Sequence, residues 1–392
     1  DGSSWANASN SIQNMIDDSA IGDEVWVASG TYTPVNSEQF NFSRNGVSIC
    51  GGFVGSETEL SQRKLADLNT DYKIDSYEFV NKTILKTSTD NYQVILCFSG
   101  TIDGFYITGG KANIANAAFQ SSGGGIYASS STITNCTISD CYAIVNGGGI
   151  YARDSKIMNC LVTNCNAYKD GGGVYATNST VSNCTISNCS STHSNSYQSG
   201  GGIYANNSLV SNCFVSNCSV GKYSSGGGVY SLGTSSSVIN CTISNCTAPR
   251  NGGGIVGHNI SNCKVSKCSS NSGGGIYTIT YTNNTTTVMD CIIDSCIAAN
   301  GGGIYITPTN NTSNFINNIS NCNVRNCSAS LNGGGIYSEL NGVTKCTVTS
   351  CSATRGGGIS GSVSFCVVSN SFANNFGGGI YGGATNCTVT NC

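Results

Sequence analysis

Short stretches that alternate apolar and small polar residues dominate the chain after residue 122. One copy of the pattern runs Val174-Tyr175-Ala176, then Thr180-Val181-Ser182, then Thr185-Ile186-Ser187. Alternation with a period of two is typical of β-strands that bury one face, and a helical apolar spacing is absent from the copies. Asparagine and glycine separate the stretches, and both accept the left-handed backbone conformation that a tight corner requires. Each copy is therefore predicted to form three short strands joined by corners.

A Gly-Gly-Gly triplet opens every copy and sets the length of the repeat. The eleven triplets begin at residues 123, 147, 171, 200, 226, 252, 273, 301, 333, 356 and 377, so successive triplets are 21 to 32 residues apart. Self-similarity at this period indicates a solenoid or a propeller. About 24 residues at ~3.3 Å each supply three strands and three corners, which is too little for a four-stranded propeller blade.

Two other repeat architectures are also excluded by the sequence. Leucine is missing from the fixed places that a leucine-rich repeat requires, and the glycines come in triplets rather than at every third position as in collagen. The remaining fold class is all-β: a right-handed parallel β-helix, that is, a three-sided β-solenoid. Each strand is expected to pair with its copy in the next coil, and the right hand follows from the usual chirality of parallel crossovers.

The alternation also assigns side chains to the inside or the outside of the coil. If Ile186 points inward, Cys184 shares its face, and a corner at Asn188 resets the alternation so that Cys189 points inward too. We therefore predict ladders of inward cysteines and of corner asparagines, whose amides would hydrogen-bond from coil to coil and so avoid the cost of burial. The residues assigned to these ladders are Cys136, Cys141, Cys160, Cys165, Cys184, Cys189, Cys213, Cys218, Cys241, Cys246, Asn135, Asn159, Asn183, Asn188, Asn212 and Asn217.

The 23 cysteines include ten C-x4-C pairs, from Cys136/Cys141 to Cys387/Cys392. Five residues of strand span up to ~16 Å, well beyond the ~7 Å between Cα atoms that a disulfide tolerates, so a bridge within a pair is disfavoured. Zinc would require closer cysteines or interleaved histidines, and the chain has two histidines. Buried thiol ladders are the preferred interpretation; disulfides between coils and metal binding by the thiols stay open as alternatives.

Several motifs carry a resemblance to known proteins. The phrase Gly-Gly-Gly-Ile-Tyr, followed by a short polar strand and an Asn-rich corner, resembles the repeats of polymorphic outer-membrane proteins and the wider pectin-lyase-like set of secreted bacterial β-helix proteins. Residues 1–8, 22–32 and 102–110 look like the N-terminal cap region of that secreted set. The resemblance implies a right-handed β-helix at a bacterial cell surface or outside the cell. This chain has Asn-Cys-x-Ile-x-Asn-Cys where the outer-membrane repeats have Phe-x-x-Asn.

The chain is divided by this pattern into an N-terminal cap with irregular coils at 1–122 and eleven regular coils at 123–392. Within residues 1–20 a short capping helix is expected, with Trp5, Ile12, Met15 and Ile16 near one face and Ser9 or Asn10 as its N-cap. Strands are predicted at 25–28, 47–50, 83–85, 94–98 and 102–108, and a polar surface loop at 55–77. Because the chain stops at Cys392 in the middle of a copy, further repeats or a docking partner are expected there.

Charge limits the possible partners. The formal net charge is −3; residues 1–122 carry 14 acidic and 7 basic side chains, a balance of −7, whereas residues 123–392 carry 6 and 10, a balance of +4. Neither region has the concentrated basic stripe expected of a nucleic-acid-binding protein. The sequence has no run of 18 apolar residues, so no membrane span is predicted within the chain, and no signal peptide is recognisable.

The repeats offer few groups for catalysis. A polysaccharide lyase or hydrolase on this fold requires clustered carboxylates, for calcium or as an acid and a base. The repeats contain only Asp140, Asp154, Asp170, Asp290, Asp294 and Glu339. Asp290 and Asp294 are close in sequence but have no evident arginine or lysine partner of catalytic type. No catalytic, metal or cofactor-binding residue is therefore assigned.

The outer faces suggest binding instead. Tyrosine follows the glycine phrase in nine copies, and an outward aromatic ladder could contact sugar rings or a neighbouring column, or simply stabilise the strands. Insertions at 278–287 and 306–318 add Asn283 and Asn310 as candidate recognition residues. The tyrosines assigned to this possible glycan or partner surface are Tyr127, Tyr151, Tyr175, Tyr204, Tyr230, Tyr277 and Tyr305.

We therefore predict a non-enzymatic structural or adhesive protein: a stalk, a filament subunit or an adhesin passenger. Its expected partners are further copies of itself, end to end or side by side, or a glycan or protein on a host or neighbouring cell. The alternative is a glycan-binding or polysaccharide-cleaving β-helix.

Overall fold

The computed structural model describes residues 2–35, 38–87, 89–115, 119–193, 198–278, 286–306, 317–339 and 342–392. The chain divides into two compact units, unit 1 (Asp1–Cys189) and unit 2 (Ser190–Cys392). The boundary at residue 122 that we expected from the sequence lies inside unit 1. Among the described residues, no helix is both long and apolar enough to cross a membrane.

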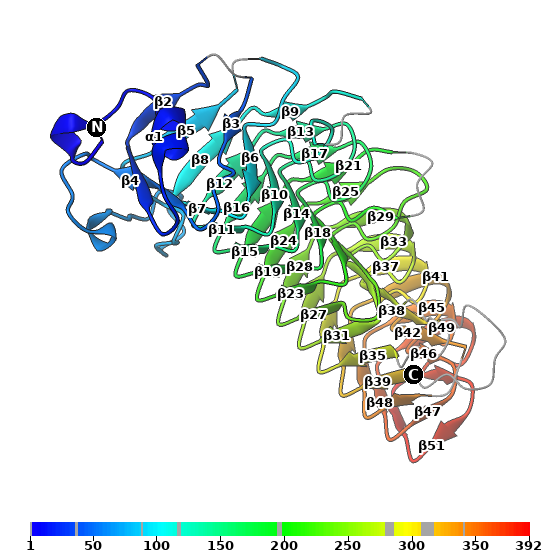
Figure 1. Cartoon of the computed structure of the whole chain (residues 1–392). Helices are drawn as coiled ribbons and strands as arrows, with labels where there is room; N and C mark the ends of the chain where they lie inside the picture. The colour runs from blue at the N-terminus through cyan, green and yellow to red at the C-terminus, as the bar shows by residue number, and fades with distance from the viewer. Residues whose placement is uncertain are drawn as a thin grey trace. The chain divides into compact units, whose positions relative to one another are not determined.

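Unit 1 is built from coils whose strands pair in parallel with the equivalent strands of the next coil (Figure 1). Sheet A of unit 1 contains β1 (Glu24–Ala28), β4 (Ser48–Phe53), β7 (Thr101–Asp103), β11 (Thr132–Thr134), β15 (Lys156–Met158) and β19 (Thr180–Ser182). Sheet B contains β2 (Gly30–Tyr32), β5 (Thr83–Lys86), β8 (Phe105–Thr108), β12 (Thr137–Ser139), β16 (Leu161–Thr163) and β20 (Thr185–Ser187). Sheet C contains β3 (Phe40–Asn41), β6 (Ile95–Phe98), β10 (Ile126–Ser129), β14 (Ile150–Arg153) and β18 (Val174–Thr177), and sheet D contains β9 (Lys111–Ala112), β13 (Tyr142–Ala143) and β17 (Asn166–Ala167).

Unit 2 repeats the same four sheets. Its sheet A contains β23 (Leu209–Ser211), β27 (Ser237–Ile239), β31 (Asn259–Ser261), β35 (Thr286–Met289), β39 (Asn317–Ser320), β43 (Val343–Thr344), β47 (Val363–Ser364) and β51 (Ala384–Thr385). Its sheet B contains β24 (Phe214–Ser216), β28 (Thr242–Ser244), β32 (Lys264–Ser266), β36 (Ile292–Asp294), β40 (Asn323–Arg325), β44 (Thr347–Thr349), β48 (Val367–Ser369) and β52 (Thr388–Thr390). Its sheet C contains β22 (Ile203–Asn206), β26 (Val229–Leu232), β30 (Ile255–Gly257), β34 (Ile276–Thr278), β38 (Ile304–Ile306), β42 (Ile336–Ser338), β46 (Ile359–Ser360) and β50 (Ile380–Tyr381). Its sheet D contains β21 (Ser190–Ser191), β25 (Ser219–Val220), β29 (Thr247–Asn251), β33 (Ser269–Ser272), β37 (Ile297–Asn300), β41 (Ser328–Asn332), β45 (Ser352–Arg355) and β49 (Phe372–Phe376).

The fold is a right-handed parallel β-helix, as the sequence predicted, and the three expected strands of each copy are present. The register pairs like with like, for example Val162 with Ile186. Most coils also contain a fourth strand that the sequence did not predict; it follows the second cysteine of a copy, as in Tyr142–Ala143. This strand is often only two residues long, so its alternation is too short to recognise. The core is a column of inward side chains such as Ile133 and Ile138, which are fully buried.

The corners are left-handed, as expected, but their asparagines act mainly through the backbone. Asn183 and Asn188 both have φ of 53° and are exposed, so the expectation that their amides are buried is wrong. The main-chain N–H of Asn159 donates to the carbonyl of Ser182 in the next coil at 3.1 Å. Amide bonds between corners occur in places, as from Asn262 Nδ2 to Asn240 Oδ1 at 2.7 Å. Asparagine is used here because it tolerates positive φ.

The residue after each corner points inward and caps the strand that has just ended. Cys160 Sγ donates to the carbonyl of Met158 at 3.1 Å, two residues earlier. At the corner between sheets C and A the same position is a serine: Ser155 Oγ donates to the carbonyl of Arg153 at 2.6 Å. The cysteines of the predicted ladders are thus present as stacked, buried side chains, and burial raises the pKa of Cys160 and Cys165 well above the usual value. The thiol fills space and gives a second hydrogen bond to a carbonyl that already accepts from a main-chain N–H of a neighbouring coil, as Met158 accepts from Asn135.

The glycine triplet allows two coils to approach closely. Gly147 has φ of 65°. A Cβ atom on Gly148 would overlap the carbonyl oxygen of Gly172 and the backbone of Asn166, and one on Gly149 would lie 2.7 Å from Val162 Cγ1. All three positions therefore require glycine, the first for its conformation and the other two for space.

The N-terminal segment covers the first coil of unit 1 (Figure 1). Helix α1 (Ile12–Asp18) buries Ile12 and Ile16, as expected, but its N-cap is Ser11, whose hydroxyl accepts from the main-chain N–H of Asn14. Gln13 lies beside β3 and both donates to and accepts from the backbone of Asn41 at 2.9 Å. The side-chain amide of Gln13 thereby takes the place of a neighbouring strand and provides hydrogen-bond partners for the backbone of Asn41 at the open edge of sheet C.

Three details of the first 122 residues differ from the prediction. Trp5 is outside α1, in the 3-10 helix η1 (Trp5–Asn7). A second 3-10 helix, η2 (Leu60–Gln62), interrupts the segment that we expected to be a plain loop. The strand expected at 102–108 is two strands, β7 and β8, because Gly104 forms a corner with φ of 78°.

Candidate functional site

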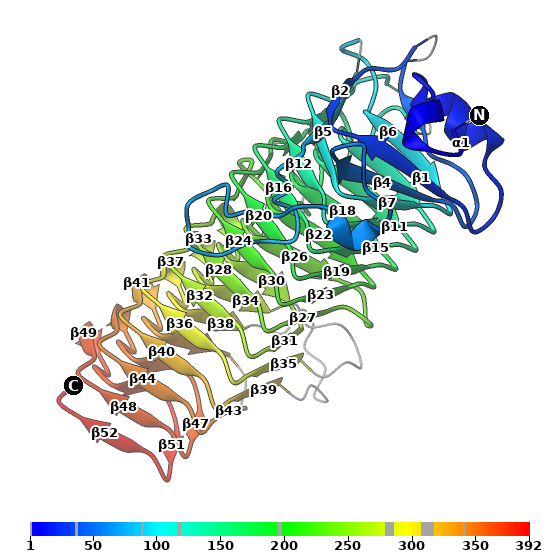
Figure 2. The same cartoon turned by 90° about the vertical axis from the view of Figure 1, so that its left-hand side faces the viewer.

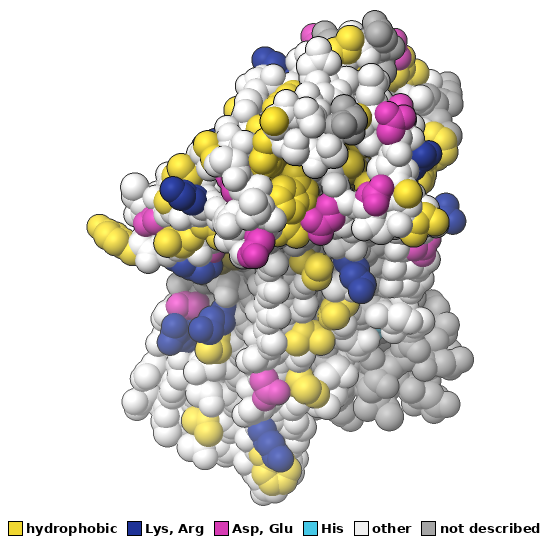
Figure 3. All heavy atoms as spheres, turned by 60° about the vertical axis from the view of Figure 1, so that its left-hand side comes forward, with side chains coloured by type: hydrophobic (Ala, Val, Ile, Leu, Met, Phe, Trp, Pro, Cys, Tyr) yellow, Lys and Arg dark blue, Asp and Glu magenta, His cyan; other side chains and the backbone are white. Residues whose placement is uncertain are grey.

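A groove of about 750 Å³ opens at the N-terminal end of unit 1, between η1, α1 and β1. Trp5 comes from η1, Met15 from α1, Glu24 and Trp26 from β1, and Tyr32 from β2. The side chains of β1 reach the groove because β1 belongs to the first coil, which has no earlier strand against it. Figure 3, which brings this end forward, shows hydrophobic side chains bordered by acidic ones.

The floor of the groove is aromatic and firmly held. Trp26 stacks on the buried ring of Phe53, with ring centroids 4.7 Å apart and planes at 12°, and Trp5 lies 6.3 Å from Trp26. The indole N–H of Trp5 donates to the carbonyl of Glu57, and that of Trp26 donates to Glu24 Oε2, both at 2.8 Å. Both tryptophans remain partly exposed. Their orientation is fixed before any ligand arrives, which lowers the cost of binding.

The groove is lined by acidic groups and no basic ones. Its carboxylates belong to Asp18, Asp23, Glu24 and Glu57, and the described lining residues include no lysine, arginine or histidine. Burial alone would raise the pKa of Glu57, but main-chain N–H groups of residues 54 to 56 donate to its carboxylate and lower the pKa overall. Glu57 therefore holds the loop in place, and the three other, exposed carboxylates give the groove its negative potential.

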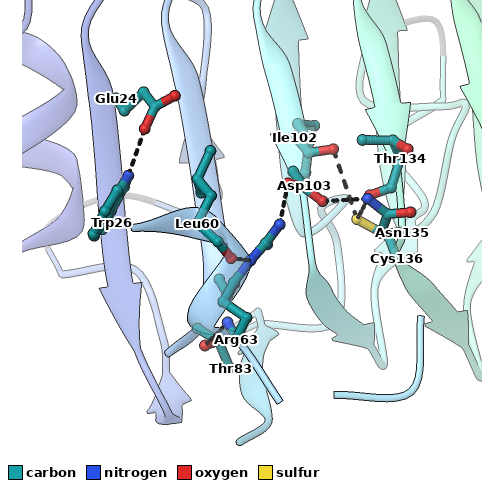
Figure 4. A network of polar contacts seen from close by, with 12 residues as sticks. Glu24, Trp26, Leu60, Arg63, Thr83, Ile102, Asp103, Thr134, Asn135 and Cys136 are labelled. Atoms are coloured by element: carbon teal, nitrogen blue, oxygen red, sulfur yellow. Dashed lines mark hydrogen bonds and ion pairs between the residues drawn. The ribbon is translucent and has the colours of Figure 1, made fainter. Parts of the chain in front are cut away.

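A buried ion pair fastens the segment after β4 to the column (Figure 4). Arg63 Nη2 lies 2.7 Å from Asp103 Oδ2, and the two side chains are only 10% and 13% exposed. The guanidinium also donates to the carbonyls of Gly51 and Leu60, and Asp103 accepts from Asn135 Nδ2 at 2.8 Å. Every charged atom of the pair is thus hydrogen-bonded, the condition for a stable buried pair. We had assigned Asp103 no role from sequence.

The segment that Arg63 anchors carries a spacing that the sequence analysis overlooked. Asp67, Asn69, Asp71, Asp75 and Glu78 stand at positions 1, 3, 5, 9 and 12 of twelve residues. This is the spacing of the oxygen ligands in an EF-hand calcium loop. A comparison of the acidic positions alone would have found it, because the chain departs from the signature at position 6, where Tyr72 replaces the glycine.

In this structure the carboxylates of that segment serve the segment itself. Asp67 accepts from the main-chain N–H groups of Asp71 and Tyr72, Glu78 accepts from three main-chain N–H groups, and Asp75 pairs with Lys73. Tyr72 has φ of 67°, at the position where the signature has glycine. Within the described ranges, no three potential ligand side chains are placed to hold a metal ion. The segment is consequently held in shape by internal hydrogen bonds.

The same segment crosses the outer face of sheet B in unit 1 (Figure 2). A smaller hollow of about 180 Å³ lies between the segment and this sheet. Tyr77, Lys82, Tyr106 and Thr163 are among its lining residues. Lys82 Nζ is 5.2 Å from the centre of the Tyr106 ring. Because this cation already occupies the ring face, the hollow offers less aromatic surface than the N-terminal groove.

The tyrosines predicted as a possible binding surface stack on one another. Tyr151 lies between Tyr127 and Tyr175, with centroid distances of 4.6 and 5.1 Å and planes within 10°. In unit 2 the stacked pairs are Tyr204–Tyr230, Tyr277–Tyr305 and Tyr305–Tyr337. The ring faces are therefore covered by neighbouring rings, which fits the structural alternative stated above. Burial raises the pKa of Tyr127 and of Tyr175 to about 12, so these hydroxyls stay protonated at neutral pH.

The remaining predicted residues are placed as follows. Asn283 and Asn310 lie outside the described residues. Asp294 has an arginine partner, contrary to the sequence analysis: Arg325 Nη2 lies 3.2 Å from Asp294 Oδ2, because β36 and β40 pair in register. Asn326 and Ser295 also donate to Asp294, and the pKa of Asp294 is lowered because these bonds and the arginine outweigh the effect of burial. The partner was missed because it is 31 residues away in sequence.

Comparisons with known proteins agree with the fold. A family model described as "Right handed beta helix region" matches residues 97–227. No curated protein matches the sequence.

Solved structures that are similar include pectate lyase Pel9A (13% identity, 80% of this chain and 74% of that chain, TM-score 0.38). A second is tailspike protein gp49 from Acinetobacter baumannii bacteriophage Fri1, a capsular polysaccharide depolymerase (13% identity, 81% of this chain and 55% of that chain, TM-score 0.37). A third is PfbA, a surface adhesin of Streptococcus pneumoniae (10% identity, 97% of this chain and 85% of that chain, TM-score 0.27). The chain thus spans about half the length of the tailspike protein.

Proposed function

We propose that this protein is a non-enzymatic structural or adhesive β-helix outside the cell or at its surface: a stalk, a filament subunit or an adhesin passenger. One observation carries the proposal. Among the described residues, the side chains that recur from coil to coil contact the backbone or the equivalent side chain of an adjacent coil: tyrosines stack on tyrosines, and thiols bind carbonyls. Side chains used in this way build a regular column and leave few of the recurring groups for chemistry.

A turnover screen tests the absence of catalysis. The purified protein is incubated with a panel of acidic and neutral polysaccharides, and reducing ends and unsaturated products are measured. We expect no product above a buffer control. Any activity is compared with that of Asp294→Asn, which removes the carboxylate of the Asp294–Arg325 pair on sheet B of unit 2. Reproducible turnover by the unaltered chain would contradict the proposal.

Electron microscopy tests the filament and stalk versions. We expect side-by-side or end-to-end assemblies of the 40.3 kDa chain that persist on dilution. Monodisperse single particles at micromolar concentration would argue against a filament subunit, and the adhesin version would then stand alone.

Glycan binding without cleavage is the second candidate. It is favoured by the N-terminal groove, where two partly exposed tryptophans lie beside carboxylates and hydroxyl groups. Aromatic faces with a few polar groups around them are the usual surroundings of a bound sugar ring. A glycan array probed with the whole chain tests this candidate separately from catalysis.

A further inference from the structure

The N-terminal groove combines three features that restrict its ligand. It has an aromatic floor of Trp5 and Trp26, a rim of Asp18, Asp23 and Glu24, and no basic side chain among its described lining residues. An anionic ligand would be repelled by these carboxylates, and a neutral ligand would gain nothing from their charge. A cation would be attracted both by the carboxylates and by the faces of the indole rings.

The size and the polar lining of the groove indicate what carries the cation. Its volume of about 750 Å³ lies within the range of about 300–1,000 Å³ that is usual for small-ligand pockets. The hydroxyl groups of Ser3, Ser4, Ser9 and Thr58 also line it. Such hydroxyls are suited to a polyhydroxylated ring, whereas a purely alkyl ammonium group has no use for them.

We propose that this groove binds an aminated sugar residue, with its ring against Trp5 and Trp26 and its ammonium group beside Asp18 and Glu24. The proposal rests on glycan binding, the second candidate function above, and adds the charge and class of the ligand. It does not depend on whether the repeats assemble or whether the chain turns over polysaccharides. A negative result in the titration below would therefore leave the structural proposal intact, and a failure of the assembly or turnover tests would leave this one intact.

The chain supplies its own probe for this test. It contains two tryptophans, and both line the groove, so the intrinsic tryptophan emission of the whole protein reports directly on the site. The emission is titrated with the glucosamine dimer and, as its uncharged counterpart, with the N-acetylglucosamine dimer. Choline and a lysine-containing tripeptide serve as two further cations without a sugar ring.

We expect a saturable change of emission with the glucosamine dimer that weakens as salt is added, because the ammonium–carboxylate attraction is screened. The double variant Asp18→Asn, Glu24→Gln keeps the shape of the groove, and the glutamine oxygen can still accept from Trp26 Nε1. It should weaken the glucosamine dimer about five-fold or more. The matched control Asp154→Asn removes a carboxylate of an exposed pair with Arg153 and should leave binding unchanged.

Each other outcome overturns part or all of the proposal. Equal binding of the acetylated dimer would refute the requirement for an ammonium group and leave plain glycan binding standing. If choline or the lysine peptide bound more tightly than the glucosamine dimer, the claim that the ligand contains a sugar ring would be refuted. If no probe changes the emission at concentrations up to about 50 mM, where ordinary weak sites with Kd near 1 mM would be filled, the groove does not bind ammonium ligands.

Discussion

In the repeats, a side chain contacts its own equivalent one coil away; in the first 122 residues, side chains from distant segments meet. Tyr127 faces Tyr151, 24 residues later, in the same position of the next coil. Arg63, by contrast, reaches Asp103, and Trp5 reaches Phe53. The repeats therefore obtain stability from periodicity, whereas the first 122 residues, here called the cap region, obtain a groove and an anchored loop from contacts that occur once. We therefore expect a ligand to bind in the cap region, where the repeat pattern is interrupted.

The strongest test of periodicity is a substitution within a glycine triplet. Gly148→Ala places a Cβ atom onto the carbonyl oxygen of Gly172 and the backbone of Asn166. Because two coils must separate to accommodate it, we expect a loss of roughly 3–5 kcal/mol, the range of severe packing errors. The control Gly109→Ala meets no atom within 4 Å and suffers only from its φ of 74°, which costs about 1–2 kcal/mol. Urea denaturation followed by circular dichroism measures both, and equal losses would contradict the close-approach argument.

The corresponding test in the cap region breaks the buried ion pair. Arg63→Ala leaves Asp103 buried without its guanidinium partner, which typically costs about 3 kcal/mol or more. We expect the loss to be local, so that limited proteolysis cuts within residues 64–80 while the repeats stay folded. Lys111→Ala removes an exposed pair with Asp90 and should cost less than about 1 kcal/mol. Proteolysis of Arg63→Ala at the rate of the unaltered chain would show that the pair does not anchor the segment.

The thiol ladder can be dissected at Cys165, whose Sγ donates to the carbonyl of Thr163 at 3.2 Å. Cys165→Ala loses this bond and some volume and should cost about 1–2 kcal/mol. Cys165→Ser should cost less, because serine already makes the equivalent bond at Ser371, where Oγ donates to the carbonyl of Ser369 at 3.1 Å. In native protein, alkylation of the buried ladder thiols should be slow, and it should become fast only after denaturation. Mass spectrometry that found coil-to-coil disulfides would refute the free ladder.

Glu57 gives the cap region a pH dependence through a carboxylate that main-chain N–H groups hold. The pKa of Glu57 is lower in the folded chain than the value of about 4.3 in unfolded peptides. Its contribution is therefore fully present above the unfolded pKa and is lost as pH falls through the folded pKa. We expect the emission of Trp5 and Trp26, measured during thermal unfolding, to show a cap transition that drops below about pH 4. In Glu57→Gln this drop should become smaller, because Asp75 is then the other cap carboxylate with a lowered pKa, and in Glu59→Gln, an exposed position, it should keep its full size.

The smallest expected effect is a gain of stability at an irregular corner. Phe365 occupies a corner with φ of 56° and is 57% exposed, so its ring contributes little while its backbone is strained. Phe365→Asn introduces the residue used at most corners and should stabilise unit 2 by roughly 0.5–1 kcal/mol. Phe372→Asn, in an exposed strand position of β49, is the control and should not stabilise. A lower melting temperature for Phe365→Asn would mean that the ring makes a contact worth more than the strain.

The repeats were predictable because their information is local and recurs. The inward orientation predicted for the side chains of Cys184, Ile186 and Cys189 was correct, since all three are buried. Each orientation follows from the alternation of a few neighbouring residues and from the equivalent residue in the next coil. What failed there was either very short, like the strand Tyr142–Ala143, or depended on the next coil, like the arginine partner of Asp294. The amide bonds predicted between coils do occur at several corners, as from Asn262 to Asn240. The expected burial of these amides failed, because the corner residue is selected for its positive φ and lies at the surface.

The sequence alone determined the fold class, the inward ladders and the three main strands, because a repeated pattern of apolar and polar residues has only one way to bury the same face in every coil. Only the tertiary structure decided where Trp5, Glu24 and Trp26 meet and which carboxylate Arg63 would reach. Trp5 and Trp26 are 21 positions apart and Arg63 and Asp103 are 40 apart, and each contact occurs once, so the repeat pattern gives no sign of them. The free energy of such contacts depends on packing in three dimensions, which no local pattern encodes.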